Sequence, residues 1–289
     1  MANEILSYKV ITDKILEKLE QGTVPWHQPW STEMSKNLVS KKEYRGINVF
    51  LLGSMGYANP YWLTYKQADQ LGGHVRRGEK STPVVFWKWM EKNTADLNED
   101  GEPRVKSYPV LRYYKVFNLD QCDEIPVEKI PALETRQDFH PIQEAEAVVR
   151  DMPHAPKIDH KSRQALYRPS TDSIEMPPGE LFGSDEEYYS TLFHELTHST
   201  GHRSRLHRFN DEELAPFGSG DYSKEELIAE MGAAFLCGHC TIVNRTIDNS
   251  AAYIQGWLNR LRNDKKLVVL AGAQAQKAAD CILARYWNS

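Results

Sequence analysis

A short segment, HELTHSTGH, constrains the fold of this chain more than any other feature. It places His194 and His198 four residues apart, with Glu195 beside the first histidine. If the segment is helical, both imidazoles project from one face and can bind a single cation at about 2.0–2.1 Å. In H-E-x-x-H sites the glutamate accepts the proton from the metal-bound water and does not bind the metal. The pattern therefore requires a helix here and a further ligand from a second element.

The residues around this segment favour that helix. Ser184 and Glu187 form a capping box, and apolar residues recur at helical spacing from Tyr188 to Leu196. Gly201 is expected to end the helix. The histidine pair therefore belongs on the C-terminal part of a helix.

The third ligand is expected on a second helix, SKEELIAEMGAA, which begins at Ser223. Glu226 and Glu230 lie on one face of that helix, next to alanines that permit close packing on the histidine helix. Spacing alone keeps Glu226, Glu230 and His202 as candidates; Glu226 is preferred because His202 follows the glycine that ends its helix. If Glu230 and His202 are not ligands, they are expected to lie next to the ligands and contact them. Two histidines and a carboxylate favour Zn²⁺, with Mn²⁺ as an alternative. If the acids at the start of the second helix only cap that helix and face solvent, no metal is needed.

A chain of 289 residues favours two domains. Residues 123–142 contain three prolines and many charges, so the boundary is placed near residue 130, between 1–130 and 131–289. STPVVFWKWM and YPVLRYYKVFNLD predict a hairpin with a long acidic loop. The predicted fold class is α+β: an α+β first domain followed by an α-rich domain with a small sheet. In that sheet, the strand DSIEMPP is a candidate edge strand for pairing with an extended peptide.

Composition excludes several classes of protein. No run of eighteen apolar residues is present, which argues against a membrane partner, and the start lacks the features of a leader, so a cytoplasmic location is expected. Four cysteines are too few and too scattered for a disulfide framework. Cys237 and Cys240 are expected to be buried on a helix.

The first 125 residues hold five of the seven tryptophans among many lysines and arginines. Aromatic rings that stack on bases and cations that neutralise phosphates suit single-stranded nucleic acid. The alternative is that most of these tryptophans form a core. The candidate DNA-binding residues are Lys41, Lys42, Arg45, Trp62, Arg76, Arg77, Lys80 and Trp87.

Both halves resemble one known family. ITDKILEKLEQGTVPWHQPW, YRGINVFLL, WLTYKQADQLGGHVRRGEKSTPVVFWK and RYYKVFNLDQ resemble the N-terminal domain of ArdC-type antirestriction proteins of conjugative plasmids and related mobile elements. HELTHSTGHRSRL with SKEELIAEMGAAFL resembles the zincin-type metallopeptidase domain that follows it. The resemblance covers nearly the whole chain, and both halves match in order. Ser199 departs from it, since an aromatic residue often follows the second histidine in relatives.

This resemblance implies a domain that binds single-stranded DNA joined to a gluzincin-like domain, which together protect incoming plasmid DNA from host restriction during conjugation. It implies His194, His198 and Glu226 as zinc ligands and Glu195 as the catalytic carboxylate. The substrate would be a protein, with a host restriction component as a candidate. In the alternative, DNA binding alone protects the incoming DNA, and the metal has only a structural role. A metal-dependent nuclease fits less well, because two histidines and one glutamate suit peptide hydrolysis better than the oxygen-rich sites that act on phosphodiesters.

Overall fold

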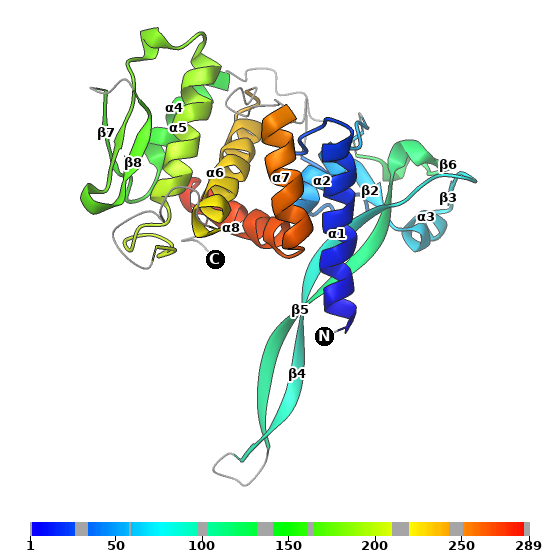
Figure 1. Cartoon of the computed structure of the whole chain (residues 1–289). Helices are drawn as coiled ribbons and strands as arrows, with labels where there is room; N and C mark the ends of the chain where they lie inside the picture. Colours follow the sequence, from blue (N-terminus) through cyan, green and yellow to red (C-terminus); the bar gives the residue numbers. More distant parts are fainter. Residues whose placement is uncertain are drawn as a thin grey trace.

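The computed structural model describes residues 2–26, 34–57, 59–97, 103–131, 141–160, 164–209, 220–242 and 251–285. Its α-helices are α1 (Ala2–Glu20), α2 (Ile47–Gly53), α3 (Tyr65–Leu71), α4 (Pro141–Asp151), α5 (Asp185–Ser199), α6 (Gly220–His239), α7 (Ala251–Asn263) and α8 (Leu267–Ile282). Its strands are β1 (Lys36–Asn37), β2 (Tyr61–Leu63), β3 (His74–Val75), β4 (Thr82–Leu97), β5 (Pro103–Asn118), β6 (Cys122–Asp123), β7 (Lys157–Asp159), β8 (Leu166–Arg168) and β9 (Ser173–Glu175). The mixture of helices and small sheets confirms the predicted α+β class (Figure 1).

The centre of the molecule is helical. Helix α6 packs against both α5 and α8. Its residues from Leu227 to Cys237 are almost all buried, as expected of a helix that is apolar on most sides and therefore cannot face water. This central position of α6 fixes where its acidic first turns meet the histidine helix.

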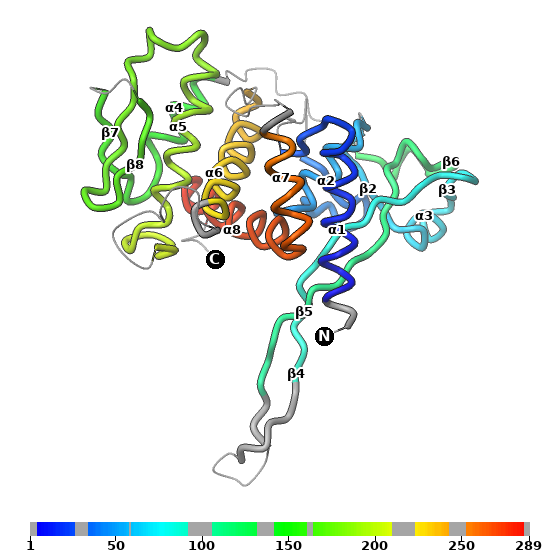
Figure 2. Tube along the Cα trace, viewed as in Figure 1, coloured from blue at the N-terminus to red at the C-terminus, as the bar shows by residue number. Residues whose placement is uncertain are grey.

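The predicted hairpin is present and is longer than its apolar pattern indicated. Strands β4 and β5 pair antiparallel from Thr82↔Val116 outwards, with a register shift between Asn93 and Leu97. The hairpin forms one edge of a sheet with the order β1-β2-β5-β4. Its outer part projects far beyond the helical body, whereas its base lies beside α1 (Figures 1 and 2).

The small sheet of the second half has the order β7-β9-β8 and lies against α5. The predicted edge strand DSIEMPP forms β9, which pairs with β7 on one side and β8 on the other. The prediction that DSIEMPP is the edge strand is therefore wrong. The edge that lies next to α5 is formed by β8.

One buried core contains residues from both sides of residue 130. Phe50 on α2 stacks on Phe235 on α6 with ring centroids 4.6 Å apart. Trp26, just after α1, meets Trp257 on α7 edge to face, with ring centroids 5.8 Å apart. The same cluster of buried side chains continues into the centre of the helical half. The division into 1–130 and 131–289 stays a prediction, because the packing does not separate at that point.

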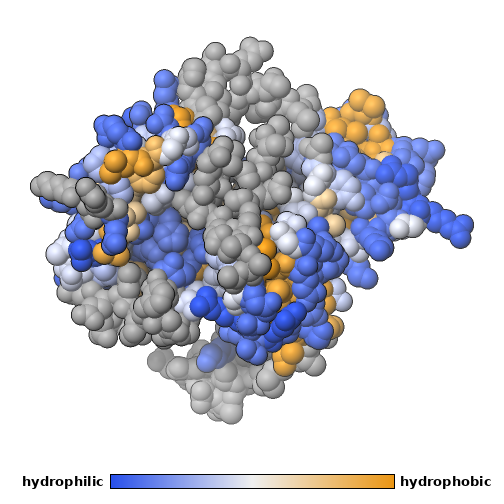
Figure 3. Space-filling model, turned by 45° about the horizontal axis from the view of Figure 1, so that its top comes forward, coloured by the Kyte–Doolittle hydropathy of each residue, from blue (hydrophilic) through white to orange (hydrophobic). Residues whose placement is uncertain are grey.

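In the parts of the chain that the structure describes, no helix is both long enough and apolar enough to cross a membrane. On the face shown in Figure 3, hydrophobic residues gather in separate patches among hydrophilic ones. Cys237 and Cys240 are buried on and just after α6, as expected, and burial raises the pKa of the Cys240 thiol to about 12. A thiol held neutral in this way behaves as a small apolar core residue.

Candidate metal centre

Helix α5 carries the histidine pair, and its start is capped as the sequence predicts, with one difference. The Ser184 hydroxyl accepts a hydrogen bond from the Glu187 N–H at 3.2 Å. The Glu187 carboxylate accepts from the N–H of Gly183, 2.9 Å away, and not from that of Ser184. Three acids in the first turn also favour the helix through its dipole. The helix remains regular as far as His198.

Close contact between α5 and α6 brings the acidic side chains to the histidines. Gly232 on α6 packs against Thr197 on α5 so closely that an added Cβ would lie 2.4 Å from the Thr197 Cγ2. Only glycine fits at that separation. The small residue that permits this approach is Gly232, whereas the sequence had pointed to the neighbouring alanines.

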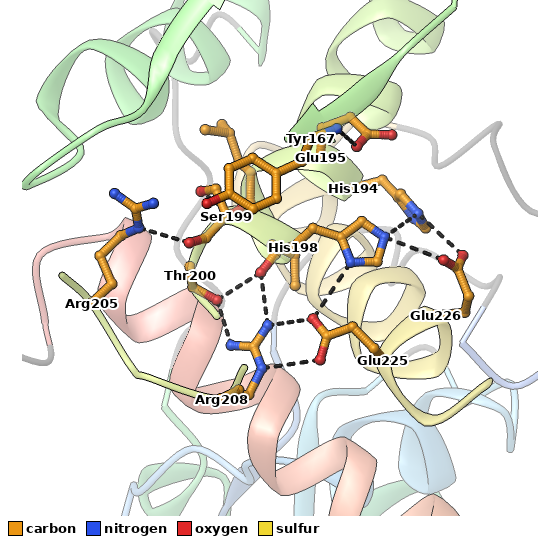
Figure 4. A network of polar contacts seen from close by, with 12 residues as sticks. Tyr167, His194, Glu195, His198, Ser199, Thr200, Arg205, Arg208, Glu225 and Glu226 are labelled. Carbon is orange, nitrogen blue, oxygen red and sulfur yellow. Dashed lines mark hydrogen bonds and ion pairs between the residues drawn. The ribbon is translucent and has the colours of Figure 1, made fainter. Parts of the chain in front are cut away.

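Three side chains converge on one point between these helices (Figure 4). The Nε2 atoms of His194 and His198 lie 3.1 Å apart. Glu226 places its Oε1 3.5 Å from Nε2 of His198 and its Oε2 3.6 Å from Nε2 of His194. Bonds of about 2.0–2.1 Å to a tetrahedral ion imply ligand separations of about 3.3–3.4 Å. The two nitrogens lie close to this separation, and each has one oxygen of the Glu226 carboxylate near it, which suits a small divalent ion. Among the described residues, His194, His198 and Glu226 are the group of potential ligands close enough together to hold a metal ion.

The charges around His194 favour a cation at this point. Burial opposes protonation of His194, but its hydrogen bond to Glu226 and the negative charges of Glu195, Glu226 and Glu230 outweigh burial and raise its pKa to about 9. The same acidic surroundings that favour a protonated imidazole would favour a bound divalent ion.

A second carboxylate lies behind His198, and the sequence analysis did not identify it. Glu225 Oε1 is 3.4 Å from Nδ1 of His198. Arg208 donates to both Glu225 oxygens, at 2.6 and 3.2 Å. It also donates to the Thr200 hydroxyl at 2.6 Å (Figure 4). Burial opposes ionisation of Glu225, but His198 and Arg208 together hold its pKa below the ordinary value. Glu225 is therefore the charged partner nearest Nδ1 of His198, although the two atoms lack hydrogen-bond geometry. A carboxylate in this position can align a ligating imidazole.

Glu225→Gln is expected to weaken binding of Zn²⁺ or Mn²⁺ about 10- to 100-fold, because the charged partner that aligns His198 is lost. Competition with a chromophoric chelator would measure the dissociation constant. Glu180→Gln, an exposed acid-to-amide change outside the cluster, is the control and should leave the affinity unchanged. Equal affinities for both variants and the wild type would show that Glu225 does not orient the ligand.

Glu195 is buried and turned towards strand β8. Its Oε2 accepts a hydrogen bond of 2.7 Å from the backbone N–H of Tyr167. The position of this strand is fixed by Asp172, which accepts from the Tyr167 hydroxyl at 2.9 Å and pairs with the buried Arg205. Arg205 also donates to the carbonyl of Ser199 at 2.8 Å, so the end of α5 and the edge strand are held together. Glu195 is thus held next to the three converging side chains without being one of them.

The two remaining candidates, Glu230 and His202, contact other partners. Glu230 accepts hydrogen bonds from Trp26 Nε1, at 2.9 Å, and from the Tyr253 hydroxyl. Burial raises the pKa of Glu230 to about 6 despite these donors. Nδ1 of His202 is 2.8 Å from the Ser204 hydroxyl and 3.7 Å from Asp172. Neither side chain belongs to the converging set of His194, His198 and Glu226.

The candidate DNA-binding residues differ in their burial and in their partners. Trp62 is only 1% exposed and meets Tyr57 edge to face, so the structure does not support a base-stacking role for it. Arg45 pairs with Asp280 on α8, and Arg76 pairs with Glu79 and Asp123. The remaining candidates are exposed: Lys41, Lys42, Arg77, Lys80 and Trp87. Apart from Trp62, their role in DNA binding stays a prediction.

The fold and the site define a protein with a zincin-like candidate metal site in its second half and a projecting hairpin in its first half. Residues 7–117 match the family model described as the N-terminal domain of anti-restriction factor ArdC, and residues 143–274 match that of a zincin-like metallopeptidase. The chain belongs to the ArdC antirestriction family, which confirms the resemblance.

Solved structures and curated relatives agree with this assignment. The metal-free crystal structure of antirestriction ArdC from plasmid R388 is 38% identical, covers 97% of this chain and 98% of its own, and superposes with a TM-score of 0.72. Its Mn(II)-bound form gives the same identity and coverage and a TM-score of 0.71.

The Sinorhizobium fredii protein y4eC is 34% identical over 94% of this chain and 90% of its own length. Two Escherichia coli DNA primases TraC are 36% and 37% identical over 96% of this chain. The chain spans only 27% and 20% of these primases.

Proposed function

We propose that this protein binds single-stranded DNA with its N-terminal half and protects plasmid DNA from restriction when the DNA enters a new host during conjugation. Membership of the antirestriction family supports this proposal. The similarity to part of the Escherichia coli DNA primase TraC agrees with a role on DNA. Binding of this kind would take place in the cytoplasm of the recipient, where the incoming strand and the restriction enzymes meet.

The second half, in this proposal, is a peptidase that uses one divalent metal ion, Zn²⁺ or Mn²⁺. The observation that carries it is the convergence of His194, His198 and Glu226 at ligand separations. A metal ion bound there would polarise a peptide carbonyl and lower the pKa of a bound water. The fit of the donors and the Mn(II)-bound relative both support a divalent ion.

Glu195 would act as the general base. Its Oε2 is held by the Tyr167 N–H, which leaves Oε1 to accept the proton of the attacking water and then to pass it to the leaving amine. Because Tyr167 lies on β8 at the edge of the sheet, an extended peptide paired with that edge would run past the carboxylate. A folded host restriction component with one extended segment is the kind of substrate that suits this arrangement.

Glu195→Gln tests the proposal. The change keeps the shape of the side chain and should leave the metal in place, but it removes the base, so peptide hydrolysis should fall by about 10²- to 10⁴-fold. Protection of an incoming plasmid in a restricting recipient should fall with it. Metal content by elemental analysis and mating frequency into restricting and non-restricting recipients are the measurements.

Asp185→Asn, the same kind of change in the first turn of α5, is the matched control and should protect like the wild type. If Glu195→Gln binds metal and still protects fully, the peptidase proposal fails. In that event, protection would rest on DNA binding alone.

A further inference from the structure

The β4–β5 hairpin carries an unusual set of exposed rings. Among the hairpin side chains that the structure describes, the exposed large hydrophobic ones are all aromatic: Phe86, Trp87, Trp89, Tyr108 and Tyr114. Exposed aromatic rings that gather on one projecting element mark a surface that binds something. Because the hairpin extends away from the helical body (Figure 1), a long ligand could reach both of its faces.

Strand register sorts these rings into two faces, since alternate residues point to opposite sides of a strand. The pairs Phe86↔Arg112, Lys88↔Val110 and Met90↔Tyr108 alternate with Trp87↔Leu111 and Trp89↔Pro109. We call the first set, together with Tyr114, the Phe86 face: Phe86, Lys88, Met90, Tyr108, Val110, Arg112 and Tyr114.

Helix α1 covers part of the opposite face. Tyr8 meets Trp87 edge to face, with ring centroids 6.4 Å apart. The Ser7 hydroxyl donates to the carbonyl of Leu111 at 3.1 Å. Trp87 therefore has a packing role at the base of the hairpin, which accounts for one exposed ring without a ligand. The Phe86 face has no cover from α1, but at its base Phe86 meets the buried Tyr44 with ring centroids 6.1 Å apart. Phe86 is still 46% exposed, so part of its ring remains open to a ligand.

The rings of the Phe86 face form a track. Phe86 and Tyr114 are each 46% exposed and meet edge to face with centroids 5.8 Å apart. Tyr108 lies opposite Met90, four residues further along β4 than Phe86, which is about 13 Å at the rise of a β-strand. Lys88 lies between these two positions. Rings and cations therefore alternate over a distance that suits a few nucleotides.

All charged side chains in this part of the hairpin are positive. Residues 82–90 and 108–118 contain Lys88, Arg112 and Lys115 and no aspartate or glutamate. Two of the three cations, Lys88 and Arg112, are on the Phe86 face. Stacking rings with interspersed cations and no acids bind single-stranded nucleic acid without reading base edges, whereas an apolar protein partner would not need the cations.

We propose that the Phe86 face is the surface on which single-stranded DNA lies, with bases stacked on Phe86, Tyr114 and Tyr108 and phosphates beside Lys88 and Arg112. That the ligand is single-stranded DNA rests on the proposed function. The location of the binding surface rests on the exposed rings and cations of the hairpin. This surface differs from the one that Arg45 and Arg76 would mark, where both guanidinium groups form ion pairs. Binding on it shows little preference for base sequence.

The test uses the full-length chain and a fluorescent 20-nucleotide oligo(dT), with binding followed by anisotropy. Phe86→Ala with Tyr114→Ala is expected to weaken binding on the order of tenfold per ring, that is about 100-fold. Lys88→Ala is expected to reduce the slope of log affinity against log salt by about 0.7. Trp89→Ala is the matched control, because Trp89 is 68% exposed on the opposite face of the same hairpin; its affinity should remain that of the wild type.

Each outcome decides one point. A wild-type protein that does not bind oligo(dT) overturns the proposed function itself. Wild-type binding that survives Phe86→Ala with Tyr114→Ala overturns only this location, and a loss confined to Trp89→Ala assigns the ligand to the other face. Equal affinity for a 20-base-pair duplex also overturns the stacking model.

If the double alanine variant has a lower melting temperature than the wild type, Phe86→Leu with Tyr114→Leu preserves the apolar surface without rings. It should show the same loss of binding.

Discussion

Replacing His194 by alanine is expected to abolish the rise in melting temperature that Zn²⁺ or Mn²⁺ gives the wild-type protein. An ion that binds only the folded chain stabilises it by about 2.7 kcal/mol when present at 100 times its dissociation constant. For a protein of this size that is a rise of several degrees. With one imidazole removed, His198 and Glu226 hold the ion weakly and the rise disappears. Scanning calorimetry of chelator-treated protein, with and without added metal, measures the difference.

His202→Ala is the matched control for this prediction. His202 follows the same helix, but its Nδ1 lies against the Ser204 hydroxyl and not among the ligands. It should keep the full metal-dependent rise. Glu226→Gln should lose most of that rise, whereas Glu230→Gln should keep it, because Glu230 is bound by Trp26 and Tyr253. If Glu230→Gln loses the rise and Glu226→Gln keeps it, the third ligand has been assigned to the wrong turn of α6.

The parts of the site that depend on local spacing could be predicted from the sequence. Two histidines one helical turn apart after a capped start required a helix, and a glutamate on a second helix supplied the third donor. Glu225 and Arg208 could not be predicted in the same way. Glu225 looks like an ordinary acidic residue near a helix start, and Arg208 lies 17 residues before it. Their pairing depends on how α5, α6 and the segment after α5 pack together.

Strand predictions failed where position within the sheet mattered. A period of two residues identifies a strand, but it does not say whether neighbours pair on one side or on both. DSIEMPP has such a pattern and is the central strand β9. Trp62 lies on a strand of three residues that is buried throughout, so its ring belongs to the core. For the same reason, the two faces of the β4–β5 hairpin could be distinguished only after the register was known.

The second large effect is expected for Phe50→Ala. Phe50 is fully buried and stacks on Phe235 across the predicted boundary between the halves. Loss of a buried phenylalanine costs about 3–5 kcal/mol, because its transfer energy is lost and a cavity remains. The melting temperature should fall by on the order of 10 °C. Calorimetry of the wild type and the variant gives both the temperature and the number of transitions.

The number of transitions bears on the organisation of the whole chain. If α1, α2 and the helices of the second half share one core, Phe50→Ala should lower a single transition, and a metal ion bound near His194 should raise that same transition. Trp89→Ala, which removes an exposed ring of similar size, should change it little. Two separate transitions, of which Phe50→Ala lowers only the one insensitive to metal, would mean that the halves unfold independently. The packing of Trp26 and Phe50 on the second half would then contribute little to stability.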